Sequence, residues 1–435
     1  MEPFYKTAEE IVILGNEHFP KEYSPAENLI LSSPATLSYN SPGANGYGVK
    51  RAGLVLPESV MLLISPGCCG RNSTILSRVS GYAERMFYLT LTESDLVTGG
   101  YLKKIPEACA EVADAAEERT GKRPRAIVLC ITCVDALLGT DLERVARACE
   151  KKVEGIRVVP SYMYALTREG TKPPMTAIRK TLYSLLEKKA VNPHAVNLLG
   201  NFAHLRDDCE LYALLHGVGL TEIREIGSME TFDDYLQMGE ANFNLVMNPE
   251  SIYAAEDLAA RLGMPYVTMA RLYDPVKIAR QYELLGAAIG VQFEDEGFRA
   301  EAEERKKQFL SAHPHLRIVL GQQMDASPFE LAAGFVRDGY EVPEIFASPA
   351  PSDLPFLRDL AAVSPETRIY AGTHPSMAAF ETMRGEDLPD IAIGKDAAWY
   401  CPGVPSLAFS DDVQPFGYRG LIFLLDSMEE ILKSQ

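Results

Sequence analysis

The sequence predicts an α/β protein in which helices cover both faces of parallel sheets. Short apolar runs rich in β-branched residues alternate along the chain with longer amphipathic stretches. Continuous apolar strands are typical of parallel sheets that are buried on both sides, whereas half-exposed sheets alternate polar and apolar residues. The 435 residues exceed what one hydrophobic core supports, so roughly two or three domains are expected.

Breaks in the hydrophobic pattern divide these elements into three groups. A polar segment at 188–193 and a histidine-proline segment at 313–315 each precede a new strand. The resulting domains are 1–190, 191–315 and 316–435, each expected to hold a Rossmann-like parallel sheet. Strands are predicted at 60–65, 126–131, 156–160, 196–199, 245–247, 266–269, 317–320, 368–371 and 391–393, and helices at 75–86, 141–152, 207–216, 251–262, 275–289, 294–312, 328–338 and 418–433.

Composition and charge exclude several classes of function. The chain has 60 acidic and 42 basic residues, and its net charge of −18 would repel a phosphate backbone, so nucleic acid is not expected as a partner. No apolar run approaches the roughly 20 residues that span a bilayer, so no membrane partner is expected. The N-terminal residues lack the basic region of a secretory signal, and we expect a cytoplasmic protein.

Eight cysteines are the main chemical signal of this sequence. In a long cytoplasmic chain they should be reduced, and most should be buried as small apolar side chains. Four of them fit that expectation, whereas the other four occur at the ends of two predicted strands. The first group is Cys109, Cys149, Cys209 and Cys401, and the second is Cys68, Cys69, Cys130 and Cys133.

The segment PGCCG at 66–70 follows a predicted strand directly, and a predicted helix follows it. Cys68 and Cys69 are therefore expected at the carboxyl end of a parallel strand, where ligands of open α/β sheets bind. The positive end of the helix dipole would favour a thiolate there. The two glycines of the segment leave room for a bulky inorganic ligand beside the backbone.

A second strand end carries Cys130 and Cys133. Alternation along the strand turns Cys130 toward the sheet packing, whereas Cys133 comes after the last strand residue. Cys133 is therefore the preferred ligand, and Cys130 is kept as a candidate.

Three kinds of site could use these thiols. A catalytic cysteine needs a base, and no histidine accompanies either strand end in sequence. A structural zinc site usually draws its cysteine pairs from one compact module, whereas these pairs lie about 60 residues apart. An iron–sulfur cluster takes four cysteines, so two thiols from each of two subunits would complete one. Buried, unreactive cysteines are the alternative.

Several short motifs, in a fixed order, carry a resemblance to a known family. They are GC at 67–68, TESDLVTGG at 92–100, TCVDALLGTDL at 132–142, VNLLGN at 196–201, NLV at 244–246, the segment 264–266, the helix from Asp274, and FGYRG at 416–420. Together they resemble component 1 of the nitrogenase superfamily, which includes nitrogenase subunits, their cofactor-assembly scaffolds and dark-operative tetrapyrrole reductases. The resemblance covers roughly residues 36–435.

The resemblance implies three domains of the component 1 type and a role as an oxidoreductase subunit. Cys68 and Cys133 would be ligands of a [4Fe–4S] cluster shared between two subunits, with Cys69 and Cys130 as candidate further ligands or neighbours. The implied partners are a second component 1-type subunit, identical or paralogous, and an ATP-dependent iron–sulfur reductase. ATP hydrolysis would belong to that reductase, because this chain contains no Walker A motif.

Departures from the family pattern narrow the expected function. No cysteine precedes Cys68, so the eight-iron cluster of nitrogenase is not expected. Asn248 stands where nitrogenase has a cofactor-binding cysteine, and 407–416 contains no histidine, so nitrogen fixation is not expected either. The sequence favours a reductase that acts on an unidentified small-molecule or tetrapyrrole-like substrate. The alternatives are a scaffold that assembles and transfers an iron–sulfur cluster or metallocofactor, and a cluster-free interaction protein.

Candidate substrate-binding residues come from the C-terminal part of the chain. His374 and Lys395 each follow a predicted strand, at the end where ligands are expected. Asp411 and Arg419 flank the start of the last helix. Each of the four also has a structural interpretation, as a cap, a turn residue or a packed side chain.

Overall fold

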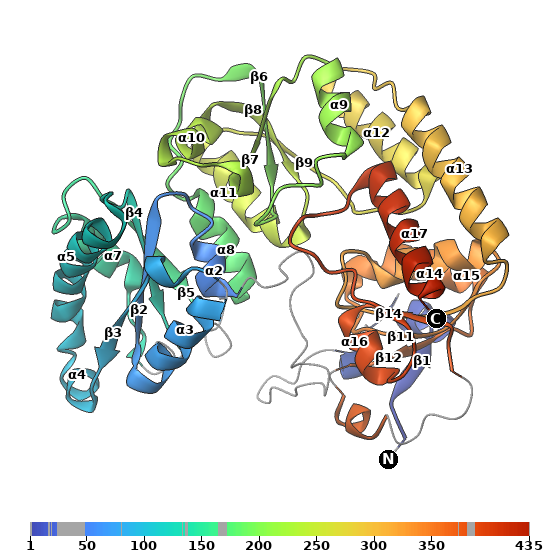
Figure 1. Ribbon diagram of the computed structural model, residues 1–435, viewed down its shortest axis with the longest axis horizontal. Coiled ribbons are helices and arrows are strands. Elements are labelled where there is room, and N and C mark those ends of the chain that lie inside the picture. The colour runs from blue at the N-terminus through green and yellow to red at the C-terminus, as the bar shows by residue number, and fades with distance from the viewer. Residues whose placement is uncertain are drawn as a thin grey trace. The chain divides into compact units, whose positions relative to one another are not determined.

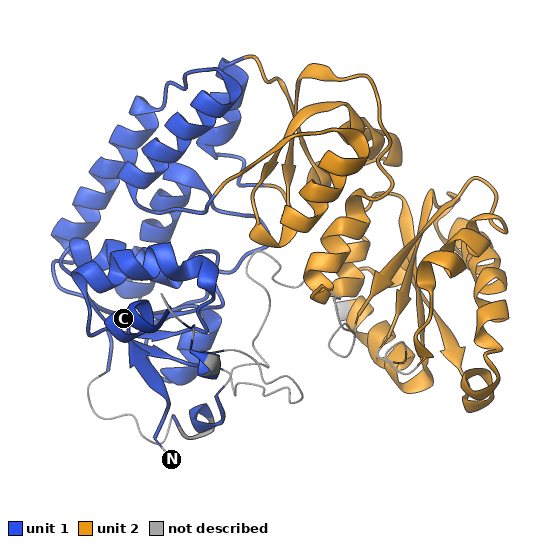
Figure 2. Cartoon of the chain, turned by 180° about the vertical axis from the view of Figure 1, so that it is seen from behind, with its two compact units in different colours: residues 1–45, 205–218, 270–435 blue, residues 46–204, 219–269 orange. Residues whose placement is uncertain are grey.

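The computed structural model describes residues 2–15, 18, 20–23, 48–79, 81–132, 134, 138–163, 172–372, 374–380 and 388–434. The chain divides into two compact units, each of which is discontinuous in sequence (Figure 2). Within the described residues, no helix has both the length and the apolar character that crossing a membrane requires. Unit 1 contains Met1–Asn45, Leu205–Val218 and Ala270–Gln435, and unit 2 contains Gly46–His204 and Gly219–Met269.

The first sheet of unit 2 has four parallel strands in the order β3-β2-β4-β5 (Figure 1). Its two central strands are buried because both faces are covered by helices, which agrees with their continuous apolar sequence. Helices α5 and α7 pack on one face of the sheet, and α2 and α8 pack on the other. The elements are β2 (Ser59–Pro66), β3 (Met86–Leu91), β4 (Ala126–Ile131), β5 (Arg157–Tyr162), α2 (Val49–Gly53), α3 (Gly67–Val79), η3 (Ala83–Arg85), α4 (Glu93–Thr98), α5 (Tyr101–Thr120), α7 (Leu142–Glu150) and α8 (Pro174–Tyr183).

The second sheet of unit 2 also has four parallel strands, in the order β7-β6-β8-β9. Its central pair carries a buried hydrogen bond in which the Asn197 amide donates to Asn244 Oδ1 at 2.9 Å. The elements are β6 (Asn192–Leu199), β7 (Glu222–Glu225), β8 (Ala241–Val246), β9 (Tyr266–Thr268), η4 (Ile226–Ser228), α10 (Phe232–Gln237), η5 (Met238–Glu240), η6 (Pro249–Ser251) and α11 (Ile252–Leu262).

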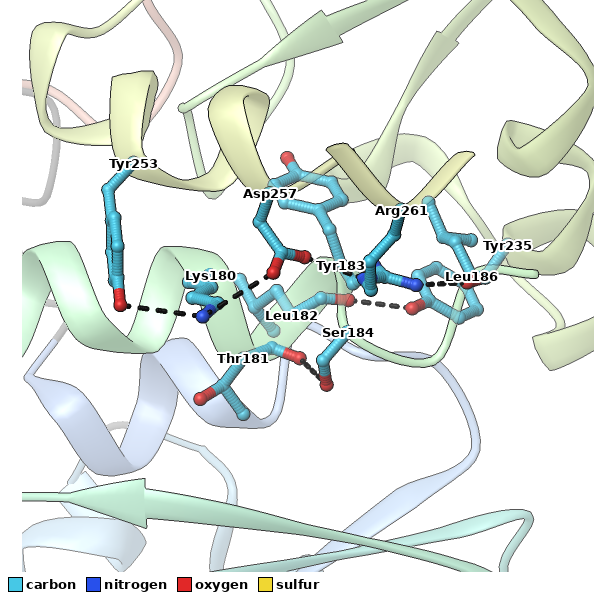
Figure 3. Close-up of polar contacts among 10 residues, drawn as sticks. All are labelled: Lys180, Thr181, Leu182, Tyr183, Ser184, Leu186, Tyr235, Tyr253, Asp257 and Arg261. Atoms are coloured by element: carbon cyan, nitrogen blue, oxygen red, sulfur yellow. Dashed lines mark hydrogen bonds and ion pairs between the residues drawn. The ribbon is translucent and has the colours of Figure 1, made fainter. Parts of the chain in front are cut away.

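Helix α8 of the first sheet meets α11 of the second, and polar contacts join them (Figure 3). The Arg261 guanidinium donates to the carbonyl oxygens of Leu186 at 2.9 Å and Tyr183 at 3.1 Å, just after α8 and at its last residue. Asp257 pairs with Arg261 at 2.7 Å and with Lys180 at 3.4 Å. One arginine therefore satisfies carbonyl groups that the end of α8 leaves without helical partners.

Unit 1 is built on a six-stranded sheet in the order β1-β12-β11-β10-β13-β14. All neighbouring strands are parallel except β1, which pairs antiparallel with β12 and brings residues near the N-terminus to this sheet. The elements are β1 (Tyr5–Thr7), α1 (Ala8–Gly15), η1 (Lys21–Tyr23), α9 (Glu210–Gly217), α12 (Pro275–Ile289), α13 (Glu296–Ala312), β10 (Arg317–Gly321), α14 (Pro328–Arg337), β11 (Glu341–Phe346), η7 (Pro351–Asp353), α15 (Leu354–Val363), β12 (Arg368–Tyr370), η8 (Pro375–Ala379), β13 (Ile391–Ile393), α16 (Lys395–Tyr400), β14 (Ser406–Leu407) and α17 (Gly417–Lys433).

The predicted α/β class with several parallel sheets is confirmed, whereas some predicted elements are wrong. The helix predicted at 75–86 is α3, which begins at Gly67 and ends at Val79, and Met86 starts strand β3. Glycines and cysteines disfavour a helix locally, but packing of Gly70 against the Tyr88 ring supports α3 from its first turn. The division into domains at 190/191 and 315/316 stays a prediction.

Candidate functional site

Two adjacent strands of unit 2 end at the edge where the cysteine segments begin. Ile64 of β2 pairs with Ile131 of β4, and the Thr132 N–H donates to the Ile64 carbonyl at 3.2 Å. The pairing therefore continues one residue beyond β4, and α3 begins at Gly67, directly after β2. Because parallel strands end at a common edge, the residues after β2 and after β4 leave the sheet on the same side.

Cys68 and Cys69 lie in the first turn of α3 at this edge. Cys68 is exposed and Cys69 is half-buried, and their sulfur atoms lie 3.9 Å apart. The structure thus has an accessible sulfur donor at the carboxyl edge of the sheet, as expected for Cys68.

Cys130 has a different environment from Cys68. It is fully buried in β4, opposite Leu63 of β2 and Ser161 of β5. Burial raises the pKa of the Cys130 thiol to about 12, so the thiol is protonated at neutral pH. That state is typical of a packed thiol rather than of a metal ligand. The other four cysteines predicted as packing residues, Cys109, Cys149, Cys209 and Cys401, are also buried.

Cys133 lies outside the described residues, and so does the segment 38–44, which corresponds to the upstream cysteine region of the family. Among the described residues, no group of three or more His, Cys, Asp or Glu side chains is arranged to hold a metal ion. The described part of one chain therefore offers sulfur donors without a complete metal site.

Two buried hydroxyl groups near the carboxyl ends of β2 and β4 lack hydrogen-bond partners among the described residues. They are Ser65 Oγ at the end of β2 and Thr132 Oγ1 just after β4, within the described part of the chain. Buried polar atoms are normally hydrogen-bonded. A bound group or a water molecule at this edge would therefore satisfy these two hydroxyl groups. Thiols are the ligands that an iron–sulfur cluster takes, and hydroxyl groups at the same edge of the sheet could donate hydrogen bonds to its sulfur atoms, which tune its reduction potential.

Lys50 is a residue near this edge that the sequence did not single out. It extends from α2 and donates a hydrogen bond from Nζ to Ser73 Oγ of α3 at 2.6 Å. Burial lowers the pKa of the Lys50 ammonium, whereas negative charge on Cys130 and Cys69 would raise it. The cation therefore lies within electrostatic range of Cys69, in the first turn of α3; residues 67–70 form this turn and are named the cysteine loop. A lysine in a short helix with a remote partner leaves no pattern in the sequence.

His374, a predicted substrate residue, lies in unit 1 and caps η8. Its Nδ1 accepts the Ser376 N–H at 3.3 Å, and its ring stacks on Phe4 with centroids 5.0 Å apart. Capping and stacking account for this side chain within its unit, so a substrate role for His374 stays a prediction.

The other three predicted substrate residues are also in unit 1. Lys395 is the first residue of α16 and is half-buried, and Asp411 is an exposed residue whose N–H donates to Asp325 Oδ2 at 2.8 Å. The Arg419 guanidinium pairs with Glu301 at 2.5 Å, and the backbone N–H of Arg419 donates to Glu210 Oε2 at 3.0 Å. Arg419 thus contacts α9 and α13 rather than the strand ends that precede Lys395 and Asp411.

Buried carboxyl groups with raised pKa values lie in unit 1, and Asp396 and Glu330 are two of them. Asp396 accepts the N–H groups of Gln322 at 2.8 Å and Gln323 at 3.0 Å, and burial raises its pKa to about 6. Burial also raises the pKa of Glu330, to about 7. The partners Gln322 and Gln323 lie 74 and 73 residues from Asp396 in sequence, so a local pattern does not predict its burial.

These features define a class: an α/β protein with several parallel sheets and accessible thiols at the carboxyl edge of one of them. Residues 47–325 match the sequence family described as nitrogenase component 1 type oxidoreductase. This match covers more than half of the chain, so the chain belongs to that family.

The individual relatives have low sequence identity to this chain. The nitrogenase molybdenum-iron protein alpha chain of Methanosarcina barkeri is 25% identical over 280 residues, which are 58% of this chain and 50% of the relative. The nitrogenase iron-molybdenum cofactor biosynthesis protein NifE of Clostridium pasteurianum is 26% identical over 211 residues, which are 47% of this chain and 44% of the relative. The NifE protein of Rhodobacter capsulatus is 29% identical over 216 residues, which are 47% of this chain and 43% of the relative. The chain thus spans about half the length of these relatives, or less.

A solved structure of nitrogenase Cp1 at pH 6.5 has the same fold. Its TM-score with this chain is 0.65, and the alignment covers 91% of this chain and 93% of that one at 16% sequence identity. A likeness at this identity shows a common fold and carries no statement about activity.

Proposed function

We propose that this chain is a nitrogenase-like reductase subunit that binds a [4Fe–4S] cluster at an interface between two component 1-type subunits. The observation that carries the proposal is the exposed Cys68 sulfur in the first turn of α3, at the edge where β4 leads toward Cys133. Each subunit would contribute Cys68 and Cys133. Four thiolates are the usual ligand set of such a cluster.

Cys68 and the residues around it support this role in three ways. Cys68 itself is exposed, so its sulfur donor is accessible to iron. Ser65 and Thr132 have buried hydroxyl groups that are without partners among the described residues, and these groups would donate to sulfur. Cys130 is protonated and packed, so we do not include it in the ligand set, and Cys69 is proposed as a close neighbour of the cluster.

A bound cluster of this kind supplies electron transfer, one electron at a time. We propose that the electrons come from an ATP-dependent iron–sulfur reductase and go to a small-molecule or tetrapyrrole-like substrate. Four residues of unit 1 stay candidates for contacts to that substrate. They are His374, Lys395, Asp411 and Arg419.

Iron and acid-labile sulfide analysis, with EPR of anaerobically purified protein, tests this proposal. We expect a cluster signal in the wild type and its loss in Cys68→Ser and Cys133→Ser. Cys401→Ala is the control, because Cys401 is buried in unit 1 and should not affect the cluster. Wild-type protein without iron and sulfide, or full occupancy in both serine variants, would contradict the proposal.

A second candidate is a scaffold that assembles a cluster or metallocofactor and passes it on. The observation that favours it is that relatives in several organisms are named NifE cofactor biosynthesis proteins. The same thiols would serve in both roles. Transfer of labelled iron from this chain to a cluster-free acceptor protein would favour the scaffold, whereas repeated turnover of a reducible substrate with the ATP-dependent partner would favour the reductase.

A further inference from the structure

Lys50 connects α2 to the helix that carries the cysteine loop. Its Nζ atom donates to Ser73 Oγ at 2.6 Å, and Ser73 is only 3% exposed, so the ammonium is held against α3. Ser73 follows Cys69 by four residues, and residues four apart lie on the same face of a helix. The hydrogen bond therefore directs Lys50 toward the face of α3 that also carries Cys69.

The electrostatic interactions of Lys50 also involve Cys69. Cys69 and Cys130 are the two thiol groups that lie within electrostatic range of the Lys50 ammonium. The Cys69 sulfur in turn lies 3.9 Å from the Cys68 sulfur, which is the exposed donor of the loop. The cation thus lies against the face of α3 that carries Cys69 and is partly shielded from water, where its charge acts more strongly than at an exposed position.

We propose that Lys50 supplies a fixed positive charge beside the Cys68–Cys69 loop and thereby makes a metal–sulfur cluster bound there easier to reduce. This inference rests on the proposed function. Reduction adds one electron to a cluster whose thiolate ligands already make it anionic, and a nearby cation stabilises the more negative state. Net charge and hydrogen bonding around the sulfur atoms are established determinants of such reduction potentials.

An EPR-monitored redox titration of the anaerobically purified protein, with dithionite as the reductant, tests this inference. In Lys50→Met, the ratio of reduced to oxidised cluster at the wild-type midpoint should fall on the order of tenfold, equivalent to about 59 mV for a one-electron couple. Lys50→Arg keeps the charge and should stay close to the wild type. Lys122→Met is the matched control, because Lys122 is exposed and precedes β4 at the opposite edge of the sheet.

Ser73→Ala keeps Lys50 but removes the hydroxyl group that holds it, so its midpoint should fall by less than that of Lys50→Met. If Lys50→Met does not fold, the midpoint of Ser73→Ala tests the inference in its place. A cluster that is present in all variants with an unchanged midpoint in Lys50→Met and Ser73→Ala would overturn this inference alone. Wild-type protein without a cluster would overturn the proposed function and this inference with it.

Discussion

The Glu210 carboxylate accepts the backbone N–H of Tyr418 at 2.6 Å, across 208 residues of sequence. The same carboxylate accepts the Arg419 N–H at 3.0 Å and the Tyr282 hydroxyl at 2.6 Å, and it is almost fully buried. It therefore satisfies the first N–H groups of α17, which have no partners within the helix. In this chain the FGYRG motif has a structural role, because it is the docking point of α17 on α9.

Replacing Gly417 with alanine should strongly destabilise unit 1. A Cβ atom at Gly417 would lie 1.9 Å from Glu210 Oε1, and the glycine has φ +65°, which side chains rarely adopt. We expect a loss of about 3 kcal/mol or more in the free energy of unfolding. Gly334→Ala in α14 is the control, because nothing lies within 4 Å of its Cβ position. Equal midpoints of thermal unfolding for the two variants would contradict this account.

The buried Glu330 carboxyl should make the protein less stable as pH rises. Burial raises its pKa to about 7, from the usual value near 4.5, so the folded protein keeps a proton that the unfolded chain has released. The free energy of unfolding should fall by about 3 kcal/mol from this group between roughly pH 4.5 and pH 7.

Glu330→Gln should remove this part of the pH dependence. Melting temperatures at pH 5 and pH 8 would measure it, with Glu303→Gln as the control because Glu303 is exposed on α13. The drop between the two pH values should be smaller in Glu330→Gln than in the wild type and unchanged in Glu303→Gln. The same drop in all three proteins would show that Glu330 is not protonated in the folded state.

Arg261→Lys should weaken the junction between α8 and α11, although it conserves the charge. One ammonium group cannot reproduce the planar fork that serves the Leu186 and Tyr183 carbonyls and Asp257 together (Figure 3). We expect a loss of about 1–2 kcal/mol in the stability of unit 2, measured by urea unfolding. Arg299→Lys, at an exposed pair with Glu303, should have almost no effect, and a comparable loss there would count against the argument.

Gly70→Ala should disturb the cysteine loop through Tyr88. A Cβ atom at Gly70 would lie 2.3 Å from Tyr88 Cδ2, so α3 or the ring must move. Iron content of the anaerobically purified protein should fall to roughly half or less. Tyr88→Ala in the same chain should restore it, whereas Gly67→Ala should be tolerated because its nearest atom, in Thr90, is at 3.6 Å. If the double variant does not recover iron, the loss of iron in Gly70→Ala is not caused by the clash with the Tyr88 ring.

The sequence predicted the parallel-sheet class because its central strands are continuous apolar runs. Strands such as β4 and β13 lie where they were predicted. Strands β3, β7 and β11 were missed because each mixes buried with exposed or half-buried residues and none is a continuous apolar run. Their strand state depends on pairing with neighbours that a local pattern does not contain.

Only those residues of the candidate site could be predicted whose side-chain chemistry and position next to a strand are both visible in the sequence. Cys68 was expected at a strand end and lies there, because a glycine-cysteine loop after a buried strand has few alternatives. Lys50 and Glu210 were not predicted. Lys50 contacts α3 through Ser73, and Glu210 contacts α17 from a distant part of the chain, so only the folded structure brings these groups together.

Native mass spectrometry of the anaerobically purified protein tests the central claim most directly. The account predicts a complex of two component 1-type subunits that carries the mass of one [4Fe–4S] cluster, and it predicts that Cys68→Ser abolishes that mass. A protein without iron and sulfide, or a single chain that holds a complete cluster by itself, would contradict the account.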